Sequence, residues 1–269
     1  MARVAATNRV ALGSSNRRFR IRDMQTSLGF TGVNTEFVTL SGLSTYNFIQ
    51  NTGVFTLGCW VELAGITGTN NYGFMGNTAG AAGDKGFNFW YNGTADALRF
   101  AAYNTSGLAF FANSTFKITP EPHLGARAFL AVKSNGGATV ELFFGVGNTP
   151  LIKNSVSGTF TSYATGASSR TLLLGVLNGT SPSVPARGAM DDFLISDQFL
   201  SDAQLDDIYY DRKLPSTYTG SFYDCNEGSG STLLDSGSFA NNGVITSVAY
   251  ASNKFNMFKR SAVSGRVAA

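Results

Sequence analysis

The segment Gly188–Asp211, GAMDDFLISDQFLSDAQLDDIYYD, changes from the pattern of a strand to the pattern of a helix within one short stretch. Ala189–Ile195 is largely apolar and strand-like. Ser201, with Gln204 three residues later, forms the pattern of a capping box, the usual start of a helix. One face of that helix is then apolar, because it carries Leu205, Ile208 and Tyr209. We expect a strand followed by one short helix.

The same segment is rich in acid, with seven of the seventeen Asp and Glu residues of the chain. The acids of its second half, Asp202, Asp206, Asp207 and Asp211, lie off the apolar stripe and predict a solvated helix face, where an acid in the first turn also suits the helix dipole. Asp191 and Asp192 are adjacent in the strand, so we expect their side chains on opposite faces of it.

Composition predicts a single all-β domain. The 269 residues include 31 Gly, 22 Phe and 10 Tyr, and only 14% of them are charged. Short apolar runs separated by turn residues are typical of many strands joined by tight turns. Hairpin turns are predicted at Asn92-Gly93 and at 134–137. The candidate strands are 28–30, 36–40, 55–63, 87–91, 98–103, 127–133, 139–144, 171–175 and 189–195. This spacing leaves no room for crossover helices.

Charge is unevenly distributed along the chain. The net charge of +3 divides into +10 on residues 1–22 and 250–269, which hold no acid, and −7 on the part between them. We expect a basic N-terminal arm at 1–25, a sandwich at 26–253 and a basic C-terminal tail at 254–269. Three interpretations of a basic arm are open: a solvated tail, a segment that docks on an acidic partner, or a segment that binds nucleic acid. We favour a protein partner because the sandwich is acidic. The arm residues proposed for assembly are Arg17, Arg18, Phe19, Arg20 and Arg22.

The sequence has no apolar run long enough to span a bilayer, and its N-terminus lacks the apolar core of a secretory signal. We therefore expect synthesis in a host cytoplasm without a signal peptide. Cys59 and Cys225 each lie in a strand-like run and are expected to be buried, with a disulfide between them left open. His123 has no recognisable nucleophile as a partner, so it predicts no catalysis.

The runs LGFTGVNTEFVTL, FTLGCWVEL, ARAFLAVKSNGGATVELFFGVGN, TLLLGVLNG and the opening segment occur in an order that resembles the laminin-G-like, concanavalin A-type jelly-roll modules of phage and bacterial surface proteins. The resemblance covers residues 27–253 and implies an all-β jelly-roll sandwich. YDCNEGSGSTLLDSGSFANNGVI is similar to the segment that usually opens such a module, yet here it comes last. We infer a circularly rearranged order, in which this segment folds back beside the first strands.

The same resemblance implies a structural calcium ion. The residues that match its ligands are Asp235, Asn241 and Asn242, together with Asp191 or Asp192. Carboxylate and amide oxygens suit this hard cation. The alternative is a turn whose backbone amides are capped by Asp and Asn side chains, as such residues commonly do.

Aromatic residues on strands are the candidates for glycan binding: Tyr72, Trp90, Tyr91 and Tyr103. The competing interpretation is that a strand aromatic packs in the core. Catalysis is not expected. Sandwich glucanases carry a Glu-x-Asp-x-x-Glu pattern on one strand, and this chain lacks it.

These observations favour a non-enzymatic structural protein of a virion, most simply a bacteriophage capsid decoration or a tail or fibre component. Its basic arms would hold it to other virion proteins and to copies of itself as a homo-oligomer. Its sandwich would present an adhesion surface for glycans or proteins, with host surface glycans as candidates. Nucleic acid and membrane insertion are not expected. The alternative is a free lectin-like carbohydrate-binding module or a glycan hydrolase.

Overall fold

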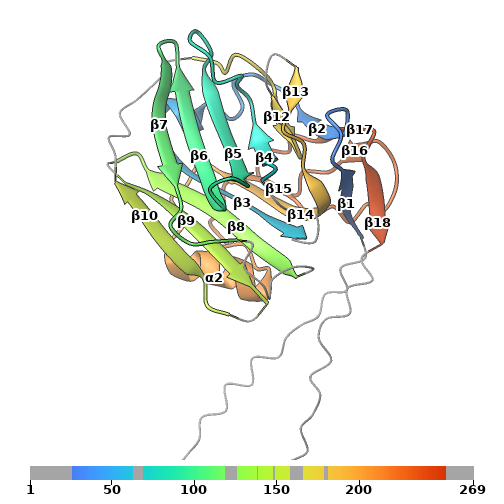
Figure 1. Ribbon diagram of the computed structural model, residues 1–269. Helices are drawn as coiled ribbons and strands as arrows, with labels where there is room; N and C mark the ends of the chain where they lie inside the picture. Colours follow the sequence, from blue (N-terminus) through green and yellow to red (C-terminus); the bar gives the residue numbers. More distant parts are fainter. Residues whose placement is uncertain are drawn as a thin grey trace, which may run out of the picture.

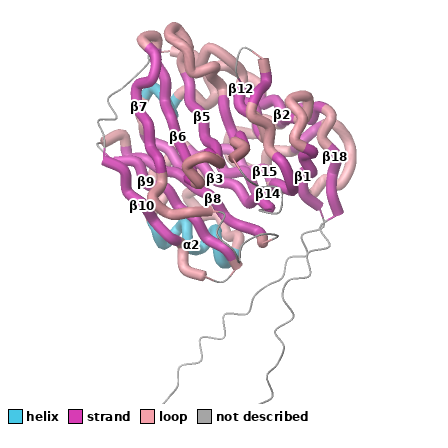
Figure 2. Tube along the Cα trace, viewed as in Figure 1, coloured by secondary structure: helices cyan, strands magenta, loops and turns pink. Residues whose placement is uncertain are grey.

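The protein is a sandwich of two antiparallel β-sheets (Figures 1 and 2). The computed structural model describes residues 26–62, 69–118, 126–137, 139–147, 149–157, 166–178 and 181–252. The predicted all-β jelly-roll class is confirmed. The two basic arms and His123 lie outside the described residues, so the predicted domain boundaries stay predictions.

Sheet A has eight strands. Seven follow one another in the order β10 (Ile152–Ser157), β9 (Thr139–Val146), β8 (Arg127–Asn135), β3 (Val54–Glu62), β14 (Arg187–Ser196), β1 (Thr26–Thr31) and β18 (Ala249–Ser252). The eighth, β15 (Gly220–Tyr223), pairs with the second half of β14, while β1 pairs with the first half. The long strand β14 therefore organises the centre of this sheet.

Sheet B also has eight strands. Their order is β16 (Thr232–Leu233), β17 (Gly243–Thr246), β2 (Phe37–Leu40), β11 (Leu172–Leu174), β4 (Tyr72–Gly76), β5 (Gly86–Asn92), β6 (Ala97–Asn104) and β7 (Gly107–Asn113). A separate hairpin, β12 (Leu177–Asn178) and β13 (Pro182–Ser183), lies on the outer face of β4. It approaches so closely that a Cβ at Gly73 would come within 2.6 Å of the Val184 carbonyl oxygen.

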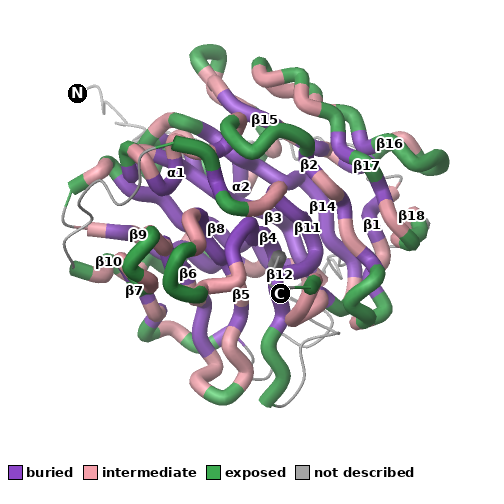
Figure 3. Tube along the Cα trace, turned by 90° about the horizontal axis from the view of Figure 1, so that it is seen from above, coloured by how far each residue is buried: buried purple, intermediate pink, exposed green. Residues whose placement is uncertain are grey.

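The core lies between the two sheets. Alternate residues of each strand point inward, as the strand period requires: Phe55, Leu57 and Cys59 of β3 are fully buried, and so are Phe87 and Phe89 of β5. Figure 3 shows this buried interior running along the middle of the strands, with exposed residues concentrated in the connecting loops. The helix α1 (Phe48–Asn51) adds the buried Ile49 to the same core.

The last strands fold back beside the first ones, as the sequence predicted. β17 pairs with β2 in sheet B, and β18 pairs with β1 in sheet A. A buried hydrogen-bond cluster ties the two parts of the chain together, because the Tyr46 hydroxyl lies 2.9 Å from both the Ser221 and Tyr223 hydroxyls and accepts from Asn241 Nδ2 at 3.0 Å. The return of the chain is therefore fixed by both strand pairing and side chains.

The predicted strand-to-helix segment is also present. The helix α2 (Asp202–Asp211) follows β14, and its N-cap Ser201 accepts a hydrogen bond from Gln204 N while the Gln204 side chain accepts from Ser201 N. Leu205, Ile208 and Tyr209 are buried on one face of it. The capping box and the apolar stripe thus appear where the sequence placed them.

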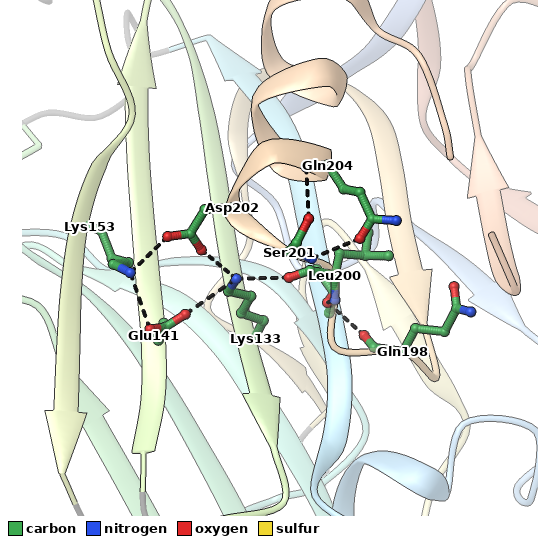
Figure 4. Close-up of polar contacts among 9 residues, drawn as sticks. Lys133, Glu141, Lys153, Gln198, Leu200, Ser201, Asp202 and Gln204 are labelled. Carbon is green, nitrogen blue, oxygen red and sulfur yellow. Dashed lines mark hydrogen bonds and ion pairs between the residues drawn. The ribbon is translucent and has the colours of Figure 1, made fainter. Parts of the chain in front are cut away.

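A buried lysine anchors the start of α2 to sheet A (Figure 4). Lys133 of β8 is 1% exposed, and its Nζ donates to the Leu200 carbonyl oxygen at 2.8 Å and to Asp202 Oδ1 at 2.6 Å. Glu141 Oε2 lies 3.3 Å from the same Nζ. Lys153 reaches the other oxygen of Asp202 at 2.8 Å. The hydrogen bonds from Lys133 and Lys153 lower the pKa of Asp202.

We expect Asp202→Asn to lower the free energy of unfolding by about 1 kcal/mol at pH 7, because a charge-assisted hydrogen bond to a buried lysine is weakened while solvent screens the half-exposed carboxylate. The carboxylate contributes fully above its unfolded pKa of about 3.9, and this contribution is lost as pH falls through the lower folded value. Urea melts of wild type and variant should therefore converge as pH falls below the unfolded pKa of Asp.

Asp207→Asn, on the exposed side of the same helix, is the control and should leave stability within about 0.5 kcal/mol of wild type. A constant gap between Asp202→Asn and wild type from pH 7 to pH 2.5 would contradict this account of the Lys133 anchor.

Candidate functional site

The two outer faces of the sandwich differ. On sheet A, the helix α2 buries a second apolar cluster, in which Tyr209 stacks on Trp60 with ring centroids 5.5 Å apart and packs against Phe129. This face is therefore closed over β8 and β3. On sheet B, the hairpin β12–β13 covers β4, while large side chains of β5, β6 and β7 remain partly exposed. Phe111, the exposed aromatic residue of the described strands, thus lies on sheet B.

Strand alternation sorts the aromatic residues of β5 between the two faces. Phe87, Phe89 and Tyr91 are fully buried in the core, and the Tyr91 hydroxyl donates to Asp96 Oδ1 at 3.0 Å. Trp90, between Phe89 and Tyr91, points to the opposite face and is half-buried. A single strand therefore supplies both core rings and a surface ring.

The half-buried Trp90 forms one corner of a surface that we call the aromatic platform: Trp90, Arg99, Tyr103, Phe111 and Asn113. Arg99 of β6 lies opposite both Trp90 of β5 and Asn113 of β7, so these three side chains form a row across the strands. Phe111 is 40% exposed, and its ring centroid lies 6.2 Å from that of Trp90. Two aromatic rings and a guanidinium group thus meet on an open sheet face.

The Arg99 guanidinium is held in place from two sides. Its Nε donates to Asn113 Oδ1 at 2.7 Å, and its Cζ lies 5.2 Å from the Phe111 ring centroid. Asn113 is itself oriented, because its Nδ2 donates to the Ser114 carbonyl oxygen at 3.1 Å. Partial desolvation lowers the pKa of Arg99, but a guanidinium remains charged at any physiological pH.

Two neighbouring segments bound the platform. Tyr103 lies against the turn before β5, where a Cβ at Gly80 would come within 3.1 Å of its ring, and burial raises its pKa. On the other side, Asn88 is buried near Leu177 of β12, and its Oδ1 has no hydrogen-bond partner among the described residues. The platform therefore occupies the span from the β12–β13 hairpin to β7.

The four aromatic residues predicted for glycan binding separate into two pairs. Trp90 and Tyr103 lie on the platform and are half-buried. Tyr72 and Tyr91 are 4% and 0% exposed and stack on each other in the core, so neither ring can meet a sugar. Core packing, the competing interpretation, describes this second pair.

Sequence reasoning missed Phe111 and Arg99. The run Gly107–Asn113, GLAFFAN, contains two adjacent phenylalanines, and in a strand only one of them can enter the core. Phe110 is 5% exposed and Phe111 faces outward. The adjacent pair was the available signal for an exposed aromatic residue.

Asp191 and Asp192 do not point to opposite faces, and the reason is a β-bulge. The register between β14 and β3 shifts between Asp191 and Leu194, and Asp192 has a φ of 48°. Both carboxylates are buried and both meet Arg212, which follows α2. The Asp191 carboxylate also accepts from Arg127 at 2.6 Å. The expectation of opposite faces was therefore wrong.

These acids form a buried ion-pair cluster with two arginines. Burial, and next the neighbouring Asp191 carboxylate, raise the pKa of Asp192 to about 7, while Arg212 opposes this rise. Arg212 adopts a left-handed conformation with a φ of 50°, which brings its side chain from the end of α2 to β14. The cluster thus joins the end of the helix to sheet A, as Lys133 joins its start.

The other residues predicted as calcium ligands cap a turn. Asp235 accepts hydrogen bonds from the backbone N–H groups of Phe222, Gly237 and Asn241, at 2.9, 2.8 and 2.8 Å. Asn242 Oδ1 accepts from Asp235 N at 2.9 Å. This is the capped turn that the sequence left as the alternative to a metal site.

Calcium does not fit this set of residues. The oxygens of Asp191 and Asp235 are already used, and Arg127 and Arg212 would repel a cation at the buried acid pair. Within the described ranges, no three His, Cys, Asp or Glu side chains gather closely enough to hold a metal. We therefore derive no role for a metal.

Both cysteines are buried and free. Cys59 and Cys225 therefore form no disulfide with each other. Burial raises the pKa of Cys59 and Cys225, which disfavours the reactive thiolate. In the part of the chain that the structure describes, neither helix has the length and hydropathy needed to cross a bilayer. The predicted assembly residues Arg17, Arg18, Phe19, Arg20 and Arg22 lie outside it.

Solved structures are similar to this chain. A candidate carbohydrate binding protein from Bacteroides ovatus aligns with a TM-score of 0.54 and 12% identity, covering 85% of this chain. This chain spans 60% of the length of that protein. A heptameric SAP-like pentraxin from Limulus polyphemus gives 0.46 and 12% identity, covering 83% of this chain and 96% of the pentraxin.

The CBM40 module of the Ruminococcus gnavus IT-sialidase gives a TM-score of 0.42 and 15% identity, covering 65% of this chain and 94% of the module. No protein-family model and no curated protein matches the sequence. At these identities the likeness to the Bacteroides ovatus protein establishes the fold of the chain.

We expect Arg212→Met to lower the free energy of unfolding by about 3–5 kcal/mol, because it leaves two buried carboxylates with one guanidinium. This loss of unfolding free energy should be larger at pH 8 than at pH 5.5. The pKa of Asp192 already exceeds its unfolded value and rises further without Arg212, so protonation relieves the repulsion as pH falls. Urea denaturation at both pH values measures this.

Lys213→Met changes the next residue, which is exposed, and serves as the control. A cost below about 1 kcal/mol for Arg212→Met, or a cost that does not change with pH, would show that the buried acids do not depend on Arg212.

Proposed function

We propose that this protein is a non-enzymatic carbohydrate-binding module whose aromatic platform on sheet B is the binding surface. The observation that carries the proposal is a pair of rings, the half-buried Trp90 and the exposed Phe111, on a sheet face that neither α2 nor the β12–β13 hairpin covers. Two aromatic rings side by side on one sheet face favour a ligand with an apolar face.

The chemistry of a sugar ring matches the platform. One face of a pyranose presents C–H groups that pack on an aromatic ring, while its hydroxyls require fixed donors and acceptors. Arg99 and Asn113 supply such polar groups beside the rings, and their mutual hydrogen bond orients both before a ligand binds. An open surface of this kind binds weakly, so several copies acting together would supply avidity.

The arrangement of acids supports a binding role over a catalytic one. Glycoside hydrolysis uses two carboxyl groups at a set separation across the bound sugar. The aromatic platform contains no carboxylate, and the buried pair Asp191 and Asp192 is engaged by Arg127 and Arg212. The hydrolase alternative therefore lacks a catalytic pair at the proposed surface.

We expect Trp90→Ala and Phe111→Ala each to weaken glycan binding about tenfold or more, because each removes one of the two exposed rings. A glycan array first identifies ligands of the wild-type protein, and titration calorimetry then measures the variants. Thermal melts confirm that the variants remain folded.

Phe199→Ala is the matched control. Phe199 is 39% exposed, close to the 40% of Phe111, but it lies beside Lys133 on the sheet A side of the molecule. Its loss should leave affinity unchanged. Equal binding by all three variants and wild type, or no glycan bound by wild type, would refute the proposed surface.

We further propose that the module is a structural component of a bacteriophage virion, a capsid decoration or a tail or fibre protein, and that its basic arms hold it in the assembly. Thr26 of β1 pairs directly with Ser252 of β18, so the two arms attach side by side at one end of sheet A. Ten basic residues thus extend from adjacent points of an acidic sandwich, which favours docking on acidic surfaces of neighbouring subunits.

Deletion of residues 1–25 should abolish self-association or incorporation into particles while leaving glycan affinity unchanged, because the platform lies on the folded sandwich. Light scattering and particle incorporation measure the first, and calorimetry the second. A chain with Gln in place of Arg17, Arg18, Arg20 and Arg22 tests the charge alone. An intact assembly state after deletion would favour the alternative of a free lectin-like module.

A further inference from the structure

Arg99 has no counter-charge among the described residues. Ion pairs among the described residues use Arg127, Arg212, Lys133, Lys153 and Arg170, and none of them involves Arg99. Its partners there are the neutral Asn113 oxygen and the Phe111 ring. A half-buried cation therefore stands on the platform without an acid beside it.

The guanidinium also has unused donors. It carries five N–H groups, and the hydrogen bond to Asn113 uses the one on Nε. The remaining four, on the two Nη atoms, have no hydrogen-bond acceptor among the described residues. Two parallel N–H groups on one guanidinium match the two oxygens of a carboxylate, and this bidentate pairing is stronger than a neutral hydrogen bond.

We propose that Arg99 selects glycans that carry a carboxylate, so that the sugar packs on Trp90 and Phe111 while the acid group pairs with the free Nη donors. This inference rests on the proposed function and specifies its ligand class. Asn113 acts as a positioning residue, because its Oδ1 fixes the guanidinium through Nε and leaves the Nη edge for the ligand.

The acidity of the sandwich does not oppose such a ligand. The four acids of α2, Asp202, Asp206, Asp207 and Asp211, belong to the helix on the outer face of sheet A, beyond both sheets from the platform. Stacked sheets lie about 10 Å apart, and charges at more than about 8 Å are largely screened at physiological ionic strength. Among the five platform residues, Arg99 carries the charge.

Other anions could use the same donors, and single-stranded nucleic acid also stacks on aromatic rings beside arginine. A carboxylate is favoured because it is planar and matches the fork, and because the net charge of −7 on the sandwich disfavours a polyanion approaching as a whole. Sulfated sugars and oligonucleotides are therefore competing outcomes of the test.

The experiment applies the full chain to an array of neutral, carboxylated and sulfated oligosaccharides and a single-stranded oligonucleotide. Each carboxylated ligand that binds is then compared by calorimetry with its methyl ester, which keeps the sugar and removes the charge. We expect wild type to bind the acid at least tenfold more tightly than the ester. Arg99→Met should lose this preference, so that it binds acid and ester with equal affinity.

Arg99→Lys should keep a reduced preference for the acid over the ester, since lysine retains the charge without the paired N–H donors of a guanidinium. Arg187→Met, on the exposed end of β14, is the control and should leave both affinities unchanged. Asn113→Ala should lower the ratio of acid affinity to ester affinity, because the guanidinium is no longer fixed through Nε. Equal binding of acid and ester by wild type, a preference for sulfated sugars or oligonucleotide, or an unchanged preference in Arg99→Met would overturn the inference. If binding depends on Trp90 without any preference for acid, the proposed function survives and only the inference fails.

Discussion

The register between β5, β6 and β7 is the constraint on which the rest of the structure depends. Because side chains alternate along a strand, a shift of one residue would move Trp90 into the core and Phe89 to the surface. The register is set by the pairing of Phe89 with Phe100 and by the turn before β6, where Asp96 caps both the Tyr91 hydroxyl and the Ile118 amide. The same alternation that fills the core thus creates the platform.

The two outer faces of the sandwich differ in what covers them. The helix α2 covers part of the outer face of sheet A. Its start is held by the buried Lys133 and its end by Arg212. No helix of the described residues lies over the outer face of β5, β6 and β7, and their outward side chains remain partly exposed. The last strands return to β1 and β2, which places Thr26 and Ser252 side by side in sheet A. The proposed binding surface therefore lies on the other sheet from the two ends of the described chain.

Much of the fold was predictable because its signals are local. The capping box at Ser201, the hairpin turn at Asn92 and the alternating runs each depend on neighbouring residues, and each formed as expected. The resemblance to jelly-roll modules added the return of the last segment beside the first strands. The assignment of faces was harder, because Trp90 and Tyr91 are adjacent and composition does not tell which of them faces the core.

The ion-pair cluster and the platform could not be predicted, because both form through contacts between residues far apart in the sequence. The bulge at Asp192 and the reach of Arg212 across from α2 placed two adjacent acids in one ion-pair cluster, where the sequence predicted opposite faces. Arg99 is one of many basic residues in the sequence, and its lack of an acid partner becomes visible only when the strands are paired. Sequence reasoning could therefore propose aromatic candidates but could not assemble the platform.

Backbone amide hydrogen exchange in the presence and absence of a bound oligosaccharide tests the central claim most directly. If the open face of sheet B is the binding surface, ligand will slow exchange in β5, β6 and β7 and leave α2 and sheet A unchanged. Slower exchange confined to sheet A, α2 or the loops between β15 and β17, with no change in β5 to β7, would contradict the account.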